Sequence, residues 1–167
     1  MTDNADIARI IHQEKTLRFK HFDEGVAWEL GSRLRDHGTA HNLPIVADVR
    51  VPGRQLFYCA LPGSSPDNPE WVRRKSNVVM RYYKSSYRVG LELEAKGQTL
   101  DEARGVSPLD FAPHGGSFPI TIEEAGVIGT VTVSGLPQRD DHGLVVEVLA
   151  GWLRHDIAGL KLVDVTF

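Results

Sequence analysis

The chain has 167 residues, the common size of one domain, and 41% of them are hydrophobic and 25% charged. Its net charge of −3 and pI of ≈ 6.1 argue against a general nucleic-acid-binding protein, which usually has a basic domain. No run approaches the roughly 20 apolar residues of a membrane span, and the first residues contain no apolar signal region. We therefore expect neither nucleic-acid nor membrane partners.

Cysteine usage bears on the compartment. Cys59 is the only cysteine, so no disulfide can form within the chain. A single thiol fits a reducing cytoplasm, and we expect a cytoplasmic protein. Cys59 lies in the apolar run 56–61, which favours a buried small side chain over a thiol nucleophile or a haem ligand.

The first part of the chain predicts two helices and a hairpin. A short helix is expected over 3–14 and a longer one over 22–37, where Asp23 can cap the start and Gly38 ends the helix. Pro52 and Gly53 predict a turn between strands over 45–51 and 54–61. This pattern indicates an antiparallel hairpin.

A long helical region is expected over 69–97, with a break near Ser85 or at Gly90 as the alternative. Asp67 or Asn68 can cap it, with Pro69 at the first helical position. A short helical turn over 100–104 and a loop over 105–117 follow.

The last part predicts strands over 118–123 and 127–134, a helix over 137–153, and a tail over 161–167 that forms an edge strand or an oligomer contact. Hairpins separated by helices imply an α+β fold with a central antiparallel sheet flanked by helices. Because no single strand alternates with a crossover helix, a doubly wound nucleotide-binding fold is disfavoured. We expect a single domain over 1–167.

Basic side chains recur along one face of the long helical region. If that region is one helix, four positions fall within about 60° of one another, with two lysines beside them: Arg74, Arg81, Ser85 and Arg88, flanked by Lys75 and Lys84. Guanidinium groups suit carboxylates and phosphates, so the stripe would line a recess for an anion. A solvated surface stripe and a subunit interface are the other two interpretations.

The loop around His114, Gly115 and Gly116 is the second candidate. Two glycines allow the backbone to approach a ligand closely, and His114 can donate a hydrogen bond, shuttle a proton or bind a metal. A purely structural loop is the alternative. The spacing matches neither a dinucleotide-binding motif nor a P-loop.

Two further clusters give weaker signals. Asp140, Asp141 and His142 lie near the start of the last predicted helix, where carboxylates favour the helix dipole and can cap free amides. His37 and His41 have the spacing of a helical metal pair, but a helix end at Gly38 would separate them. We assign no metal ligands.

The loop and the strand that follows it carry a family resemblance. The stretches HGGSFPI (114–120) and GVIGTVTVSG (126–135) resemble the GGxPI…GxIGxxxVSG pattern of the GlcG/HbpS-like family, often labelled the haem-degrading domain. The resemblance continues over 136–138 and 140–142. DNPEWVRRK (67–75) and KSS (84–86) resemble one branch, the small stand-alone proteins of uncharacterised function. Together these segments define a core of about 15–153.

The resemblance implies a central antiparallel sheet flanked by helices, and dimers that build larger assemblies. Some relatives bind haem or its iron, and some are linked to small-acid metabolism. The haem-contacting residues of the haem-binding branch do not map onto this chain, so none is carried over. The match supports these positions of interest: Arg74, Lys75, Ser85, Ser86, His114, Gly115 and Gly116.

The leading hypothesis is a homo-oligomeric protein that binds a small anionic ligand between the basic helix and the His114 loop. The ligand would be a small carboxylate or a tetrapyrrole such as haem, bound through its propionates. Charge would come from Arg74, Lys75 and Arg81, and backbone amides from Gly115 and Gly116.

Two rival hypotheses remain. In the first, the chain is an enzyme acting on such a ligand, with His114 as general acid or base. It ranks lower because no nucleophile–base–orienter set is visible. In the second, the chain is an interaction scaffold whose basic helix docks an acidic partner or a neighbouring subunit.

Overall fold

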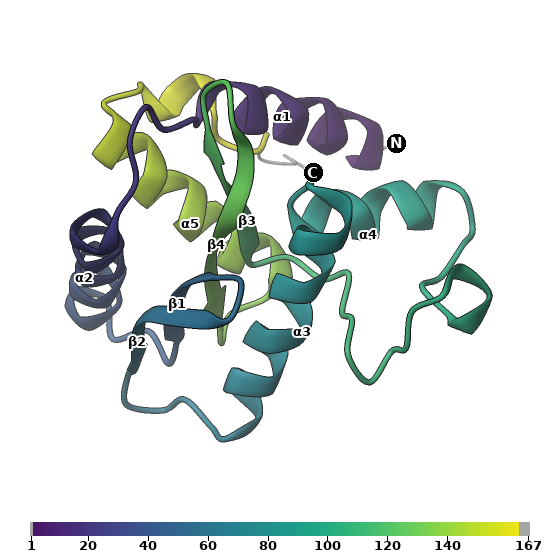
Figure 1. The fold of residues 1–167 in the computed structure, drawn as a ribbon, viewed down its shortest axis with the longest axis horizontal. Helices are drawn as coiled ribbons and strands as arrows, with labels where there is room; N and C mark the ends of the chain where they lie inside the picture. Colours follow the sequence, from purple (N-terminus) through teal and green to yellow (C-terminus); the bar gives the residue numbers. More distant parts are fainter. Residues whose placement is uncertain (1, 164–167) are drawn as a thin grey trace.

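The computed structural model describes residues 2–163, with side chains from residue 5, and centres on a four-stranded antiparallel sheet (Figure 1). The strands are β1 (Val46–Val51), β2 (Arg54–Ala60), β3 (Ser117–Ile122) and β4 (Gly126–Ser134). Their order is β2-β1-β4-β3, so the two predicted hairpins join through the β1–β4 pair. The predicted α+β fold with a central antiparallel sheet is confirmed.

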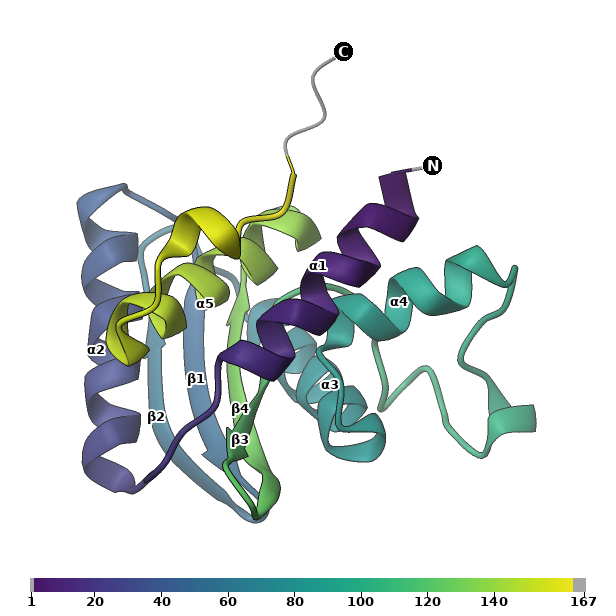
Figure 2. The ribbon, with the colours of Figure 1, turned by 90° about the horizontal axis from the view of Figure 1, so that it is seen from above.

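Five helices surround the sheet: α1 (Thr2–Thr16), α2 (Glu24–Ala40), α3 (Asp67–Tyr82), α4 (Ser86–Ala95) and α5 (Gln138–Leu153). Short 3₁₀ turns follow at Glu102–Arg104 and Ile157–Gly159. Figure 2 shows α2 and α5 on one side of the sheet, α3 on the other, and α1 beside α4. The site described below lies at the end of the sheet where β4 leads into α5.

The strands alternate between an apolar face and a polar face, as expected for a period of two residues. The apolar face packs against α2 and α5 and is buried; its residues are Ala47, Val49, Phe118, Ile120, Val131 and Val133. The polar face lies toward α3 and contains buried Asp48, Ser117, Thr130, Thr132 and Ser134. The main hydrophobic core therefore sits on one side of the sheet only.

For α2, the predicted start agrees with the structure and the predicted end is wrong. The Asp23 carboxylate caps α2 by accepting a hydrogen bond from the Val26 N–H at 2.9 Å. Gly38 does not end α2, which continues to Ala40. A Cβ at Gly38 would lie 2.5 Å from Leu61 Cδ1, so this glycine allows close packing instead of terminating the helix.

The cap predicted for α3 is also wrong. The helix begins at Asp67 with Pro66 at its N-cap and no side-chain cap, and Pro69 is the third helical residue. Asn68 Oδ1 accepts a hydrogen bond from the Ser65 N–H at 2.7 Å, so it orders the preceding turn instead.

The long helical region breaks, as the alternative prediction allowed. Tyr83 adopts a left-handed conformation with φ 54° and ends α3. Ser85 then caps α4 by accepting a hydrogen bond from the Arg88 N–H at 3.3 Å. Because the two helices have different axes, the 100° spacing used for the basic stripe does not hold across the break.

Three remaining expectations concern the chain end, membranes and Cys59. Residues 161–163 form no strand, and residues 164–167 of the predicted tail lie outside the described part. Within the described part, no helix has the length and apolar character needed to cross a membrane. Cys59 is half-buried, and burial raises the pKa of its thiol, which disfavours a nucleophilic role.

Candidate functional site

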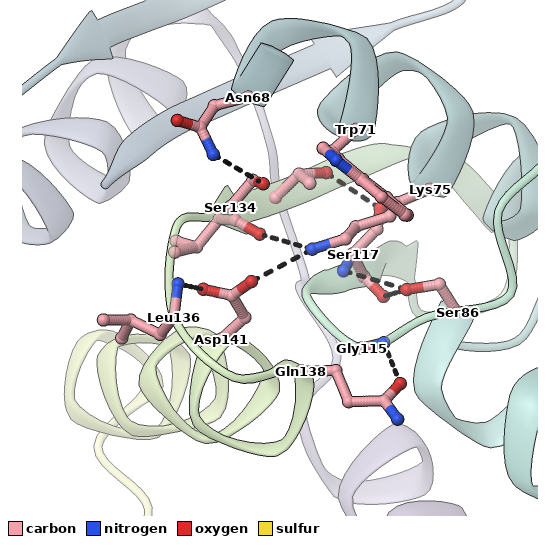
Figure 3. Close-up of polar contacts among 12 residues, drawn as sticks. Asn68, Trp71, Lys75, Ser86, Gly115, Ser117, Ser134, Leu136, Gln138 and Asp141 are labelled. Carbon is pink, nitrogen blue, oxygen red and sulfur yellow. Dashed lines mark hydrogen bonds and ion pairs between the residues drawn. The ribbon is translucent and has the colours of Figure 1, made fainter. Parts of the chain in front are cut away.

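Polar side chains from α3, the β4–α5 connection and α5 converge at the end of the sheet (Figure 3). They surround a cavity of about 410 Å³, which we call the lysine cavity. Its walls are formed by Asn68, Trp71, Lys75, His114, Ser134, Gly135, Leu136, Gln138 and Asp141. Cavities of this size are typical of small-molecule sites.

An ion pair between Lys75 and Asp141 forms one wall of the lysine cavity. Lys75 Nζ lies 3.0 Å from Asp141 Oδ2, and the two side chains are only 4% and 2% exposed. Lys75 Nζ also donates to the Val133 carbonyl at 3.4 Å, and Asp141 Oδ1 accepts from the Leu136 N–H at 2.9 Å. Every charged atom of the pair therefore has a partner, as burial of charge requires.

Burial favours the neutral form of both members of this pair. It lowers the pKa of Lys75 and raises the pKa of Asp141, because low polarity favours the neutral form of each group. The attraction between the two charges opposes both shifts. Burial thus makes transfer of the proton from Lys75 to Asp141 less unfavourable than it is in water.

The two loop glycines permit this arrangement. Gly116 has φ +133°, and a Cβ there would lie 2.8 Å from Lys75 Nζ and 2.3 Å from the Val133 carbonyl oxygen. A Cβ at Gly115 would lie 2.0 Å from the Gln138 carbonyl oxygen. The Gly115 N–H donates to Gln138 Oε1 at 3.1 Å, so this amide anchors the loop on α5.

His114 stands between the lysine cavity and a second cavity. Its ring meets Trp71 edge-on, with 5.5 Å between ring centroids. The His114 side chain is exposed to solvent. Partial desolvation lowers its pKa, and the positive charges of Lys75 and Arg74 act in the same direction. A hydrogen bond with Gln138 opposes this shift. The imidazole is therefore neutral at pH 7, and one ring nitrogen offers a lone pair.

The second cavity, the arginine cavity, has a volume of about 420 Å³ and lies between α3, α4 and the loop that leads to His114. Its walls are largely apolar and include Tyr87, Leu91, Leu93, Leu100, Phe111 and Pro113. Arg74, Gln138 and His114 bring polar groups to it. An apolar cavity with a few polar groups is the usual form of a ligand site.

Arg74 is held in place at the arginine cavity. Its Nε and Nη2 donate to the Pro108 carbonyl at 3.1 and 2.7 Å, and its guanidinium lies 4.8 Å from the Trp71 ring centroid. A guanidinium has five N–H donors, so the contact with Pro108 leaves Arg74 able to bind an anion.

The structure does not bring the whole basic stripe to one site. Arg81 lines neither cavity; its guanidinium lies 6.0 Å from the Phe111 ring. Arg88 pairs with Glu14 and Glu92 at 2.6 and 2.7 Å. The prediction of a single stripe is wrong because α3 and α4 are separate helices.

Ser85 and Ser86 are buried, and their side chains form hydrogen bonds that stabilise the fold. Ser85 caps α4, and Ser86 Oγ accepts a hydrogen bond from the Ser117 N–H at 3.1 Å. These contacts join α4 to the start of β3. A ligand contact at either serine stays a prediction.

The weaker candidates resolve into structural roles. The rings of His37, in the last turn of α2, and His41, at its C-cap, stack with 4.3 Å between their centroids. His142 is buried, and its Nε2 lies 2.8 Å from Gln13 Oε1. Over residues 2–163, no group of three or more His, Cys, Asp or Glu residues is arranged to hold a metal ion.

Sequence reasoning missed several residues of the lysine cavity, above all the role of Asp141. A signal was present, because Asp141 continues the apolar stripe of Val145, Val148 and Trp152 at helical spacing. A carboxylate on the buried face of a helix requires a buried partner. Nothing in the sequence indicated that this partner is Lys75, 66 residues away.

Comparisons with known proteins agree with this architecture. A family model described as haem degrading protein HbpS-like matches residues 22–150. A UPF0303 protein of Acidobacterium capsulatum is 55% identical over 157 residues, covering 94% of this chain and 95% of that protein.

Solved structures share the fold. The crystal structure of the Ybr137w protein matches with a TM-score of 0.81 and 27% identity, covering 89% of this chain and 88% of that one. The PduOC:Heme complex matches with a TM-score of 0.62 and 13% identity, covering 74% of this chain and 90% of that one, and so shows the fold alone. Because the family model spans most of the sequence and the UPF0303 relative matches nearly all of it, the chain belongs to the HbpS-like family.

Proposed function

We propose that this protein binds a planar anionic ligand of the tetrapyrrole class, such as haem, in the arginine cavity. One observation carries the proposal: a neutral His114 imidazole lies next to Arg74 at the wall of an apolar cavity. The combination offers a lone pair for a metal centre, a cation for a carboxylate and an apolar surface for a ring.

The residues present fit haem in three respects. The leucine, phenylalanine and tyrosine side chains of the cavity suit the faces of a macrocycle. Arg74 would bind a propionate, and His114 would contact the iron. Bound haem would supply a redox-active iron to the site.

The charge for such a ligand comes from Arg74 more than from Lys75. Lys75 is already paired with Asp141 at 3.0 Å, so this pair adds little net charge. Arg74 contacts a neutral carbonyl and an aromatic ring, and it keeps its full charge. The leading hypothesis is therefore retained with Arg74 as its principal cation.

The comparisons support this choice of ligand. The matching family is described as haem degrading, and the PduOC neighbour was solved with haem. A small carboxylate remains the other ligand class that Arg74 can bind.

A haemin titration followed by visible absorbance tests the proposal. Wild-type protein is expected to give a saturable, stoichiometric Soret shift, which His114→Ala abolishes and Arg74→Ala weakens. His41→Ala is the matched control, because His41 is an exposed histidine at the C-cap of α2, outside both cavities. A weak, non-saturating change that is equal in all four proteins would refute haem binding.

Self-association also enters as a proposal, because the family resemblance implies dimers that build larger assemblies. Trp28, Tyr83 and Leu109 are 61%, 61% and 78% exposed, and such large apolar side chains favour contacts between subunits. Light scattering of purified protein should then give a mass above the 18.5 kDa of one chain. The cytoplasmic location stays a prediction.

A further inference from the structure

The buried amine of Lys75 has no role in the proposed haem site, yet it lines a cavity of its own. Its side chain is 4% exposed, but it forms part of the lysine cavity with Asn68, Trp71 and Ser134. A buried lysine beside a carboxylate, at the wall of a cavity, is the arrangement found where an amine acts as a nucleophile.

We propose that Lys75 captures a small aldehyde or 2-oxo acid in the lysine cavity as an imine, with Asp141 transferring the protons. The proposed reaction does not involve haem: Lys75 and Asp141 line the lysine cavity and not the arginine cavity, although His114 and Gln138 line both.

The pair can deliver a neutral amine without changing the charge of the cavity. Lys75 Nζ and Asp141 Oδ2 are 3.0 Å apart, so a proton can pass directly from the ammonium to the carboxylate. Burial favours this transfer because it lowers the pKa of the amine and raises the pKa of the acid. The Val133 carbonyl, 3.4 Å from Nζ, keeps the amine in place.

The rest of the cavity suits a small polar carbonyl compound. Asn68 Nδ2 donates to Ser134 Oγ at 3.3 Å, so amide and hydroxyl groups lie together on one wall (Figure 3). Gly135, Leu136 and Gln138 line the side formed by the start of α5, where the helix dipole favours an anion such as the carboxylate of a 2-oxo acid. The neutral imidazole of His114 also lines the cavity and can accept a hydrogen bond.

The reaction balances without a co-reactant. The lone pair of neutral Lys75 attacks the carbonyl carbon, and the oxygen takes the proton held by Asp141. Asp141 then removes a proton from the Lys75 nitrogen of this adduct. It passes that proton to the hydroxyl group, which leaves as water. The product is an iminium ion paired with the Asp141 carboxylate, so the charge of the site equals that of the original ammonium–carboxylate pair.

Reductive trapping tests this proposal on the wild-type protein. Folded protein at pH 7 is incubated with pyruvate and sodium cyanoborohydride. Peptide mass mapping of samples taken over time then identifies the modified lysines and gives the rate of modification of each. Lys84 is the matched internal control, because it also pairs with a carboxylate, Glu92 at 2.6 Å, but lines neither cavity. Lys96 serves as the exposed control.

Lys75 should be modified several-fold faster than Lys84 and Lys96, because burial and the carboxylate 3.0 Å away favour its neutral amine. Asp141→Asn should slow this modification, and Lys75→Met should abolish it at this position. Modification of Lys75 no faster than Lys96, or only after denaturation, would overturn the proposal. Because haemin binding is read separately, failure of one site does not imply failure of the other.

Discussion

The two faces of the sheet use the same four strands for different purposes. On the apolar face, Val49, Val131 and Ile120 are fully buried against α2 and α5, where apolar burial stabilises the fold. On the polar face, Thr132 Oγ1 contacts the hydroxyls of Ser76 and Ser117 at 3.1 and 2.8 Å. Packing on the first face depends on shape and volume, whereas the second face depends on particular polar partners.

This difference explains where the candidate site lies. Both cavities open on the side of α3, next to the polar face, and Ser134 belongs to the face and to the lysine cavity at once. An all-apolar face offers no charged or hydrogen-bonding side chain to a ligand. A face already built from hydrogen-bonded side chains can place an amine, a carboxylate and an imidazole within one small region.

The largest effect is expected from breaking the buried ion pair. Asp141→Ala leaves Lys75 buried without its partner and should lower the free energy of unfolding by about 3–5 kcal/mol. Urea denaturation measures this loss. The double variant Lys75→Met, Asp141→Leu is the control, because replacing both charges with apolar groups should restore most of the stability. A double variant as unstable as Asp141→Ala would show that the pair itself is not the cause.

A somewhat smaller effect is expected from a cavity on the apolar face. Ile120 is fully buried, and Ile120→Ala should cost about 2–5 kcal/mol in urea denaturation. Thr132→Val is the matched change on the polar face, since it keeps the side-chain shape and removes only the hydroxyl that Ser76 and Ser117 share. It should cost about 1–3 kcal/mol. A larger loss in Thr132→Val than in Ile120→Ala would reverse the division of roles between the faces.

The smallest effect near neutral pH is a change in pH dependence caused by His142, which grows only as the pH falls. Burial, aided by the charge of Arg139, lowers the pKa of His142 to about 3. As the pH falls below about 6.5, the unfolded chain binds a proton there and the folded chain does not. This residue should therefore lower the free energy of unfolding by about 1.4 kcal/mol per pH unit, between about pH 6.5 and pH 3.

His142→Gln provides the test of that slope. Its amide can still reach Gln13, the partner of His142 Nε2 at 2.8 Å, but it does not titrate. Unfolding free energies measured at several pH values should fall less steeply in the variant than in the wild type. Equal slopes would mean that His142 is protonated in the folded protein.

Local sequence patterns determined most of the secondary structure and the fold class. The strand segments 45–51 and 54–61 and the turn at Pro52 and Gly53 predicted the first hairpin, because strand and turn signals act over a few residues. The HGGSFPI and GVIGTVTVSG segments pointed to the family to which the chain belongs.

Tertiary structure decided how the residues of the candidate site come together. The sequence could not show that Tyr83 turns the chain and separates Arg81 from Arg88, because a left-handed tyrosine has no local signature. Nor could it join Lys75 to Asp141, since their contact depends on how α3 and α5 pack around the end of β4 and on the space that Gly116 leaves for the amine. Contacts between distant residues arise from packing, and packing is set by the whole fold.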